Sequence, residues 1–392
     1  MIRFVASLCL LAAGASAATW HSTATGSDLP MKILEPASGG GELRPAVLYL
    51  ENLAAPRVGT DSDASIIHDF LAQGCLVVTI DYDHAKQSRW PALNLDLAAL
   101  RNQIQHHQLL ADERLDPAHI FIVPSGCRLK RDVAFYHDGD RTLAMDIVYP
   151  AHPVHPVGSV IEFSCDNLNR MGNFSLDFCT DTILEGAAAE GYAAAMADHP
   201  VRAPYHGLDP MPQCGWMTKA AVRTLRAQSA SLDLNGRIVV AGFSRGSGMS
   251  LLLTTTTGLP AFEGHGENQG VDSSVQGAIV LAGRFTYLHL LPHDHMIPRY
   301  NIAWGTRAQH EDVWRDAGAL DYLHGPTVPL FLSINCTEGA DYQLQMQVLA
   351  RRLTELHSPF IYQPDPQPRG HRMPLDPSVL NPMLSYLRQR LH

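Results

Sequence analysis

Residues 237–248 read RIVVAGFSRGSG, and this stretch decides the fold. The β-branched run Ile238–Val240 predicts a buried strand, and the apolar run MSLLL from residue 249 predicts a helix. Between them lies a G-x-S-x-G pattern, Gly242 to Gly246, with Ser244 at its centre. Glycines two residues before and after a serine relieve the crowding of a sharp strand-to-helix turn. The stretch therefore makes Ser244 a candidate nucleophile; the simpler interpretation is a serine in an ordinary turn.

A nucleophilic serine needs partners elsewhere in the chain. Its hydroxyl becomes reactive only when a base removes its proton, and an acid must orient that base. His371 is the candidate base, because it follows Gly370 in a polar, proline-rich loop just after the last predicted strand. A solvated loop histidine is the alternative interpretation. The helix after Ser244 directs its first N–H groups toward the turn, so the backbone N–H of Arg245 is a candidate donor to an oxyanion.

Alternating strands and helices surround this turn. From about residue 131 the sequence predicts a hairpin around Asp138-Gly139, because two alternating runs flank a turn-forming pair. Further strands follow, separated by polar or helical stretches, at residues 158–163, 191–200 (a weaker one), 237–243, 277–281, 328–334 and 359–363. Such alternation is typical of a mostly parallel α/β sheet that is covered by helices on both faces.

A similar, shorter pattern occupies residues 29–129. Strands at regular spacing are predicted at residues 29–36, 44–52, 75–83 and 118–126. A helical stretch at residues 91–110 lies between the last two, and strand, helix and strand in this order imply a right-handed parallel βαβ unit. No Gly-rich phosphate loop follows any of these strands, which argues against a nucleotide site.

The turn at Ser244 follows the fifth strand of the second pattern, and in this order the residues from about 132 to 392 resemble the α/β-hydrolase superfamily over its whole length. They are most similar in style to bacterial secreted esterases of the acetyl-xylan and feruloyl esterase type. The resemblance implies an α/β-hydrolase fold and a serine carboxylic-ester hydrolase that acts through an acyl-enzyme, with no metal or organic cofactor. The expected substrate is a small-molecule or polysaccharide ester that carries an acyl or feruloyl group. The alternatives are a general short-chain esterase or lipase, a serine peptidase of the same fold, and a non-catalytic binding module.

Residues 29–129 also resemble that superfamily, over its second to fifth strands. Aligned on the turn that carries the nucleophile, Gly126 replaces the serine, and no acid or histidine segment follows before the second copy begins. We therefore expect an incomplete, degenerate copy without chemistry, a smaller Rossmann-like βαβ unit. The expected organisation is a signal peptide at 1–17, the degenerate unit at 18–130 and the catalytic domain at 131–392.

Two carboxylates compete for the role of the acid. In VPLFLSINCTEGADYQLQ (328–345), Glu338 follows the predicted strand directly and Asp341 comes three residues later. The spacing that the resemblance implies favours Glu338, whereas aspartate is the commoner acid in such sites. Asp341 is also a natural N-cap for a helix from Tyr342. We expect Glu338 to orient His371, with Asp341 as the alternative.

The resemblance places further candidates around the turn. Many relatives carry a His-Gly-Gly run after the strand at 158–163, where this chain has SCDN, so the backbone N–H groups of Cys165 and Asp166 are the candidates for the second oxyanion donor. The stretch LHLLPHDHM (288–296) contains metal-ligand residue types, but Pro292 interrupts any single helical face and we expect no metal. We expect this loop near the mouth of the pocket. The candidate substrate contacts there are Tyr287, His293 and Trp304, although aromatic residues more often belong to a core.

The N-terminus reads MIRFVASLCLLAAGASA, with a basic start, an apolar core and an A-x-A site that ends at Ala17. These are the features of a secretory signal peptide, and the apolar run is too short to span a membrane comfortably. We therefore expect a secreted or periplasmic protein. Six of the cysteines follow Ala17, and an oxidising compartment permits disulfides. We expect at least one bridge among Cys165, Cys179 and Cys214, with buried free thiols as the alternative.

Charge and composition narrow the partners. The 392 residues are 46% hydrophobic and 17% charged, which is ordinary for a folded protein. The net charge of −10 argues against nucleic acid and anionic membranes as partners. The sequence leaves the oligomeric state open.

Overall fold

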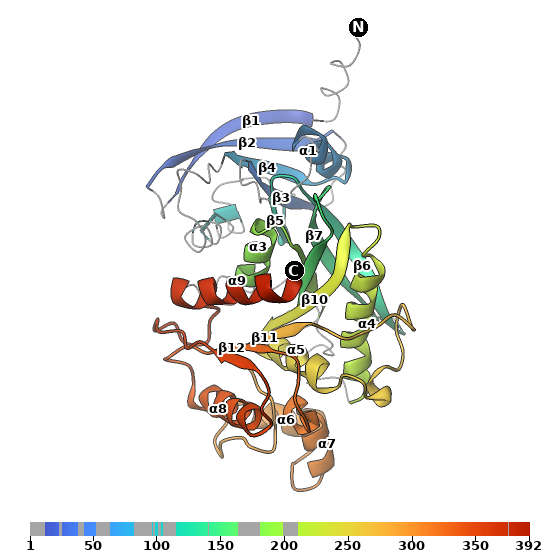
Figure 1. The fold of residues 1–392 in the computed structure, drawn as a ribbon. Helices are drawn as coiled ribbons and strands as arrows, with labels where there is room; N and C mark the ends of the chain where they lie inside the picture. The colour runs from blue at the N-terminus through green and yellow to red at the C-terminus, as the bar shows by residue number, and fades with distance from the viewer. Residues whose placement is uncertain are drawn as a thin grey trace.

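The computed structural model of the chain describes residues 12–22, 26–37, 43–51, 63–81, 96, 99–100, 103–104, 115–139, 141–163, 181–198, 211–374 and 376–392 (Figure 1). Within these residues the strands form two sheets, an N-terminal sheet of five strands and a large sheet of eight. Helices alternate with strands along most of the chain. This is the α/β class that the sequence pattern predicts.

The large sheet carries Ser244 at the end of a central strand. Neighbouring strands are parallel, except that the first two form an antiparallel hairpin and the second is also antiparallel to the fourth. The predicted hairpin around Asp138-Gly139 is thereby confirmed. In spatial order the strands are β13 (Phe360–Tyr362), β12 (Leu330–Ser333), β11 (Gly277–Leu281), β10 (Leu234–Phe243), β8 (Val157–Phe163), β9 (Ala193–Ala197), β7 (Arg141–Pro150) and β6 (Cys127–Asp138).

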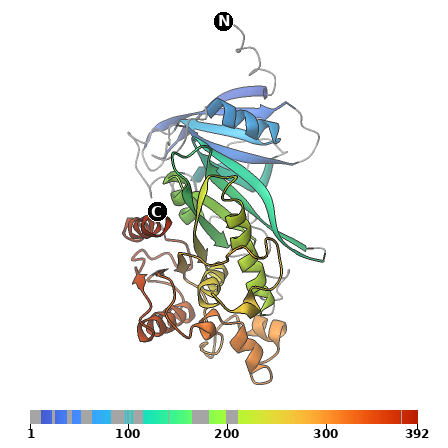
Figure 2. The same cartoon turned by 45° about the vertical axis from the view of Figure 1, so that its right-hand side comes forward.

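Both faces of the large sheet are covered. Every residue of β8, β9, β11 and β12 is buried, as expected for parallel strands between two helical layers. Helices α3 (Asp181–Ala189) and α9 (Pro377–Leu391) lie on one face, and α4 (Gln213–Ala227) and α5 (Arg245–Thr255) lie on the other (Figures 1 and 2). The remaining helices of this part are α6 (Ile297–Trp304) and α7 (Glu311–Asp316), between β11 and β12, and α8 (Ala340–Glu355), after β12.

The N-terminal sheet is mixed rather than parallel. Its spatial order is β1 (Ala12–His21), β2 (Asp28–Pro36), β4 (Leu76–Asp81), β3 (Arg44–Glu51) and β5 (Leu115–Pro124), with α1 (Asp63–Ala72) between β3 and β4. β3 is parallel to β4 and β5, but β2 is antiparallel to both β1 and β4. The connection between β1 and β2 is short, and such a connection joins antiparallel neighbours. Parallel pairing in this sheet, which we expected throughout, is limited to β4, β3 and β5 among the described residues.

The two sheets share one topology. When the strands of each sheet are numbered from its own first strand, both run 1-2-4-3-5 in space with the same relative directions. The large sheet adds a sixth, seventh and eighth strand beyond the fifth. The N-terminal sheet thus has the strand order of the first part of the large sheet.

The N-terminal sheet leads directly into the large sheet. β5 ends at Pro124 and β6 begins at Cys127, so only Ser125 and Gly126 lie between them. Gly126 has a φ of 74°, and its N–H donates to Tyr49 Oη at 2.8 Å. A strand rather than a helix follows this turn, so the strand-to-helix geometry that exposes a nucleophile is not formed there.

One apolar cluster joins the two sheets. From the N-terminal unit it contains Phe70, Val77 and Phe121, and from the large sheet it contains Leu129 and Met196. All of these side chains are buried. Each unit therefore buries apolar surface of the other, which is a favourable contribution to folding.

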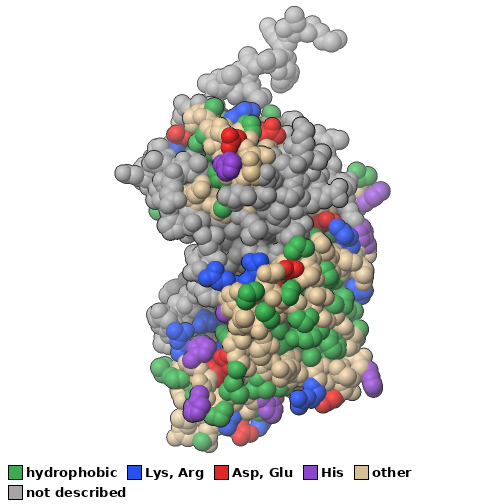
Figure 3. Space-filling view, turned by 90° about the vertical axis from the view of Figure 1, so that its left-hand side faces the viewer, with side chains coloured by type: hydrophobic (Ala, Val, Ile, Leu, Met, Phe, Trp, Pro, Cys, Tyr) green, Lys and Arg blue, Asp and Glu red, His purple; other side chains and the backbone are tan. Residues whose placement is uncertain are grey.

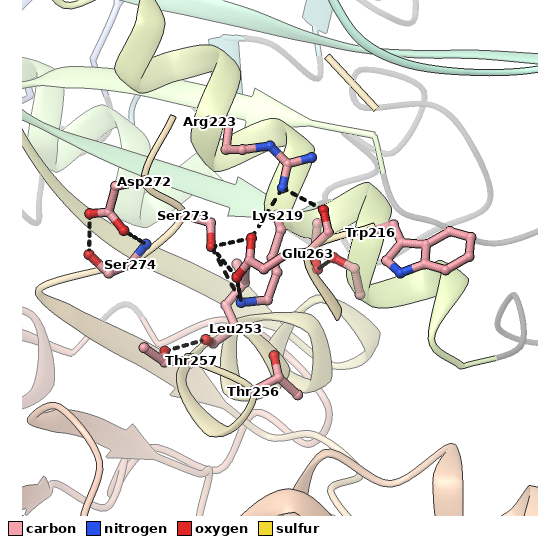
Figure 4. A network of polar contacts seen from close by, with 12 residues as sticks. Trp216, Lys219, Arg223, Leu253, Thr256, Thr257, Glu263, Asp272, Ser273 and Ser274 are labelled. Carbon is pink, nitrogen blue, oxygen red and sulfur yellow. Dashed lines mark hydrogen bonds and ion pairs between the residues drawn. The ribbon is translucent and has the colours of Figure 1, made fainter. Parts of the chain in front are cut away.

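A polar network fastens the segment between α5 and β11 to α4 (Figure 4). Lys219 and Arg223 of α4 are fully buried. Lys219 Nζ lies 2.7 Å from Glu263 Oε1, and Arg223 Nη1 lies 3.3 Å from Glu263 Oε2. Ser273 Oγ donates to the same carboxylate at 2.8 Å. A single carboxylate therefore compensates two buried cations.

Strand β1 crosses the predicted cleavage site. Its residues pair with β2 from Ala12 to His21, and Trp20 is buried in the N-terminal sheet's own core. A cut after Ala17 would leave residues 18–21 of the strand. Residues 1–11 lie outside the described residues, so the signal peptide stays a prediction.

The described cysteines leave the predicted disulfide untested. Cys75 and Cys127 are buried free thiols, and Cys336 is an exposed one. Cys165 and Cys179 lie outside the described residues, so the predicted disulfide stays a prediction.

Charged side chains of both signs are scattered over the face drawn in Figure 3, among hydrophobic and uncharged ones. In the described part of the chain, no helix has the length and apolar character needed to cross a membrane.

Candidate active site

Ser244 lies on a strained turn between β10 and α5. Its φ of 54° and ψ of −117° are unusual for a residue with a side chain. A Cβ atom at Gly242 would lie 2.1 Å from the carbonyl carbon of Gly246, so the sharp turn requires a glycine there. The Ser244 N–H donates to Leu281 O at 3.0 Å, which ties the turn to β11. The local sequence thus builds the strand-to-helix turn that the pattern predicts, with Ser244 half-buried on it.

A chain of hydrogen bonds connects Ser244 to His371 and Glu338. Ser244 Oγ lies 2.9 Å from His371 Nε2, and Glu338 Oε2 lies 2.9 Å from His371 Nδ1. The Glu338 side chain is 2% exposed and that of His371 is 23% exposed. The three residues follow β10, β13 and β12 respectively, so the same end of the large sheet brings them together.

Asn335 holds the two loops that carry Glu338 and His371. Its Nδ2 donates to Asp365 Oδ2 at 3.1 Å, and its Oδ1 accepts from the N–H of Arg369 at 3.2 Å. Its Oδ1 also accepts from the N–H of Thr337 at 2.9 Å. The sequence analysis did not identify Asn335; its position directly after a predicted strand was the available signal.

Asp341 does not contact His371. Its carboxylate bonds to the guanidinium of Arg284, a buried residue just after β11. Arg284 Nη2 also lies 2.9 Å from Asp294 Oδ1. The expected N-cap role of Asp341 is wrong as well: α8 begins at Ala340 and its N-cap is Gly339, so Asp341 lies inside the first turn.

The histidine-rich stretch 288–296 does not gather its histidines into one cluster. His293 is exposed, and His289 lines a separate cavity with Asp321 and His324. Asp294, His295 and Asp341 offer ligand atoms within 4.8 Å of one another. The guanidinium of Arg284 forms ion pairs with both of these carboxylates, so each already has a cationic partner within the protein.

The aromatic candidates for substrate contact pack against one another. Tyr300 and Trp304 stack with 4.9 Å between ring centroids and 6° between planes, and Tyr287 lies edge-on to both. Tyr287, Tyr300 and Trp314 are buried, so α6 and α7 cover a small aromatic core. Burial raises the pKa of Tyr287 to about 12. Contact of Tyr287, His293 or Trp304 with a substrate stays a prediction.

Two aromatic rings contact the imidazole of His371. Phe243, the residue before Ser244, lies 4.7 Å from it between ring centroids, and Tyr342 lies 4.3 Å from it. The guanidinium of Arg284 lies 4.2 Å from the centroid of the Tyr342 ring. The sequence analysis gave none of these three residues a role.

The oxyanion donors are only partly described. Arg245 is the first residue of α5, so its backbone N–H is one of the N–H groups at the start of that helix, beside Ser244. Cys165 and Asp166 lie in the segment 164–180, outside the described residues. The second donor therefore stays a prediction.

The comparisons with known proteins give the fold. No family model and no curated protein matches the chain. Similar solved structures include a truncated carbohydrate esterase from gut microbiota (18% identity, TM-score 0.55, 67% of this chain and 95% of that one). They also include a bifunctional GH43-CE protein of Bacteroides eggerthii (17%, 0.54, 67% and 38%) and the butyrate-bound esterase Est2 of Thermogutta terrifontis (15%, 0.51, 68% and 94%). At these identities the likeness concerns the fold: the chain has the fold of these esterases.

Proposed function

We propose that the protein is a serine carboxylic-ester hydrolase. Ser244 is the nucleophile, His371 the general base and acid, and Glu338 the carboxylate that orients His371. The observation that carries the proposal is the pair of 2.9 Å hydrogen bonds from Ser244 through His371 to Glu338, on a serine held at a strained turn. A nearly buried carboxylate at Nδ1 favours the tautomer that leaves Nε2 free to accept a proton.

The reaction follows from this order. Ser244 Oγ attacks the ester carbonyl while its proton passes to His371 Nε2, and the charge that develops on the carbonyl oxygen is stabilised by backbone N–H groups, with Arg245 as one donor. His371 then gives the proton to the leaving alcohol, which leaves an acyl group on Ser244. Water repeats the two steps on the acyl-enzyme, and the acid and free serine are released. Glu338 stabilises the imidazolium that forms in each half of the cycle.

The substrate class is part of the proposal. We favour an acyl or feruloyl ester linked to a carbohydrate, in a secreted or periplasmic protein. The name of one similar structure as a carbohydrate esterase supports the carbohydrate, and the N-terminal sequence supports export. A general short-chain ester is the second candidate, because a similar esterase holds butyrate.

We interpret residues 18–130 as a degenerate copy of the first part of the catalytic domain, 131–392. The shared 1-2-4-3-5 strand order supports this interpretation. The direct passage from β5 into β6 supports the absence of chemistry in this copy, because no helix start faces the turn at Gly126.

The test is an assay of the purified protein on nitrophenyl acetate, methyl ferulate and acetylated xylan, together with a serine-reactive fluorophosphonate probe. We expect turnover of at least one ester and labelling at Ser244. Ser244→Ala should lower kcat by about 10³-fold or more without a change in the unfolding midpoint. Wild-type turnover in the folded variant would refute the assignment. A wild-type protein that neither reacts with the probe nor hydrolyses any ester would favour a binding module.

A further inference from the structure

The base of the proposed site lies in a loop and needs support there. His371 follows Gly370, which has a φ of 66°, and the loop has no regular structure at this point. The Gly370 N–H donates to Thr337 Oγ1 at 2.9 Å, and Glu338 Oε2 lies 2.9 Å from His371 Nδ1. A hydrogen bond at one ring nitrogen fixes one point of the imidazole but allows the ring to tilt around it. Proton transfer needs Nε2 to stay in line with Ser244 Oγ.

Two aromatic rings restrict this tilt. Phe243 lies 4.7 Å from the imidazole with 33° between the ring planes, and Tyr342 lies 4.3 Å from it with 27° between the planes. The Tyr342 ring therefore stacks on the imidazole, in an arrangement that aromatic pairs favour, and the Phe243 ring contacts the imidazole at a tilt. Phe243 is a fully buried core residue, so it is fixed by its own packing. Tyr342 needs a separate support.

Arg284 supplies that support. Its guanidinium lies 4.2 Å from the centroid of the Tyr342 ring, within the range of a cation–π contact. Arg284 is buried and bonds to both Asp294 and Asp341, so its position is fixed from two directions. Asp341 directly precedes Tyr342 in the first turn of α8, so the same ion pair fixes the backbone that carries the ring.

We propose that Tyr342 is a positioning residue, whose ring, backed by Arg284, holds the imidazole of His371 against Phe243 in line with Ser244. The inference rests on the proposed function. It also gives Asp341 an indirect role, since the Asp341 carboxylate holds the Arg284 guanidinium that contacts the Tyr342 ring. A displacement of about 1 Å in a reacting group can cost about 10²-fold in rate, so the support affects kcat.

The test compares Tyr342→Phe with Tyr342→Leu in the full chain. The phenylalanine keeps the stacked ring, so we expect its kcat on nitrophenyl acetate within about threefold of wild type. The leucine loses the ring face, so we expect kcat to fall by roughly 10- to 100-fold with KM nearly unchanged. Tyr362→Leu is the matched control, because Tyr362 is 41% exposed on β13, and it should behave as wild type. Thermal unfolding of each variant shows that it is folded.

Two results would overturn the inference. Wild-type kcat in the folded leucine variant would overturn it. An equal loss in both variants would also overturn it, because it would assign the effect to the Tyr342 hydroxyl, which interacts with the Ser244 side chain. If the leucine variant does not fold, Tyr342→Met fills the same space without a ring and should show the same fall in kcat. Failure of the proposed function is distinct, since the wild-type protein itself would then lack turnover and probe labelling.

Discussion

At the residue scale, Glu338 and Asp341 are three positions apart but bond to different groups. Glu338 lies 2.9 Å from His371 Nδ1, whereas Asp341 bonds to Arg284. Glu338→Gln should lower kcat by about 10²- to 10⁴-fold, because an amide does not stabilise the imidazolium. Asp341→Asn should lower kcat less than about tenfold, because Arg284 keeps Asp294 as its partner. Steady-state kinetics of the two variants test this; a loss confined to Asp341→Asn would show that Glu338 is not the acid.

Glu162 of β8 gives a pH-dependent prediction. It is fully buried, and neither carboxylate oxygen has a hydrogen-bond partner among the described residues. Burial, and to a smaller extent Glu185, hold the pKa of Glu162 well above its usual range. Above a pH of about 4.3 the unfolded state releases the proton that the folded state keeps on Glu162. The free energy of unfolding therefore falls as the pH rises from about 4.3 toward the raised pKa.

Glu162→Gln removes the titrating group. We expect its unfolding midpoint, relative to wild type, to increase steadily from pH 5 to pH 8. Glu355→Gln is the control, because Glu355 is an exposed residue of α8. Thermal unfolding at several pH values measures the effect. Parallel midpoint curves for wild type and Glu162→Gln would contradict a protonated Glu162.

Only some residues of the candidate site could be identified from the sequence. Ser244 and His371 could be named because each stands at a distinctive place, a strand-to-helix turn and the loop after the last strand. The preference for Glu338 over Asp341 depends on the spacing that the resemblance implies, since both residues follow the same strand. The structure adds that Asp341 pairs with Arg284, and these two residues are far apart in sequence. Tyr342 could not be identified because its partner is also far away in sequence: Tyr342 lies in the first turn of α8, whereas His371 lies in the loop after β13.

At the element scale, short apolar strands were predictable and long connections were not. β8 and β11 are buried along their whole length, and such runs stand out in a sequence. The sequence predicts the loop 288–296 near the mouth of the pocket and offers Tyr287 and Trp304 as substrate contacts, whereas in the structure these two rings pack with Tyr300 and Trp314 in a small aromatic core. Aromatic residues in sequence do not reveal whether they face solvent or one another. β1 was missed because its first residues have the composition of a signal peptide.

The connection between α5 and β11 gives an element-scale prediction. Glu263→Ala would leave Lys219 and Arg223 buried on α4 without their carboxylate (Figure 4). Breaking a fully buried ion pair costs about 3–5 kcal/mol, but the Glu263 side chain is 40% exposed, so we expect roughly 1–3 kcal/mol of destabilisation. Glu355→Ala, which breaks an exposed pair with Arg352, should cost less than about 1 kcal/mol. Denaturant unfolding of both variants tests this, and equal effects would show that the network adds no stability.

At the scale of the whole molecule, the two sheets have a common strand order and are joined by one apolar cluster. Among the described residues, the N-terminal sheet has five strands, whereas the large sheet continues with three more. Its chain passes straight into β6, and one apolar cluster with Phe121 and Leu129 spans the junction. The sequence predicted the strands of both patterns, but the mixed direction of the N-terminal sheet depends on β1, which composition did not indicate. The N-terminal unit thus shares part of its core with the larger unit.

This shared core predicts what happens when the N-terminal unit is removed. A chain that begins near Lys130 loses Leu129 together with Phe70, Val77 and Phe121, and exposes the apolar surface of Met196, which belongs to the same cluster. Exposed apolar surface of this kind promotes aggregation. We therefore expect the shortened chain to aggregate or to unfold at a clearly lower temperature than the full chain, measured by size-exclusion chromatography and thermal unfolding. A soluble, equally stable chain with full activity on nitrophenyl acetate would contradict the packing argument. Retained activity on nitrophenyl acetate with loss on acetylated xylan would instead assign the N-terminal unit a part in holding the polysaccharide.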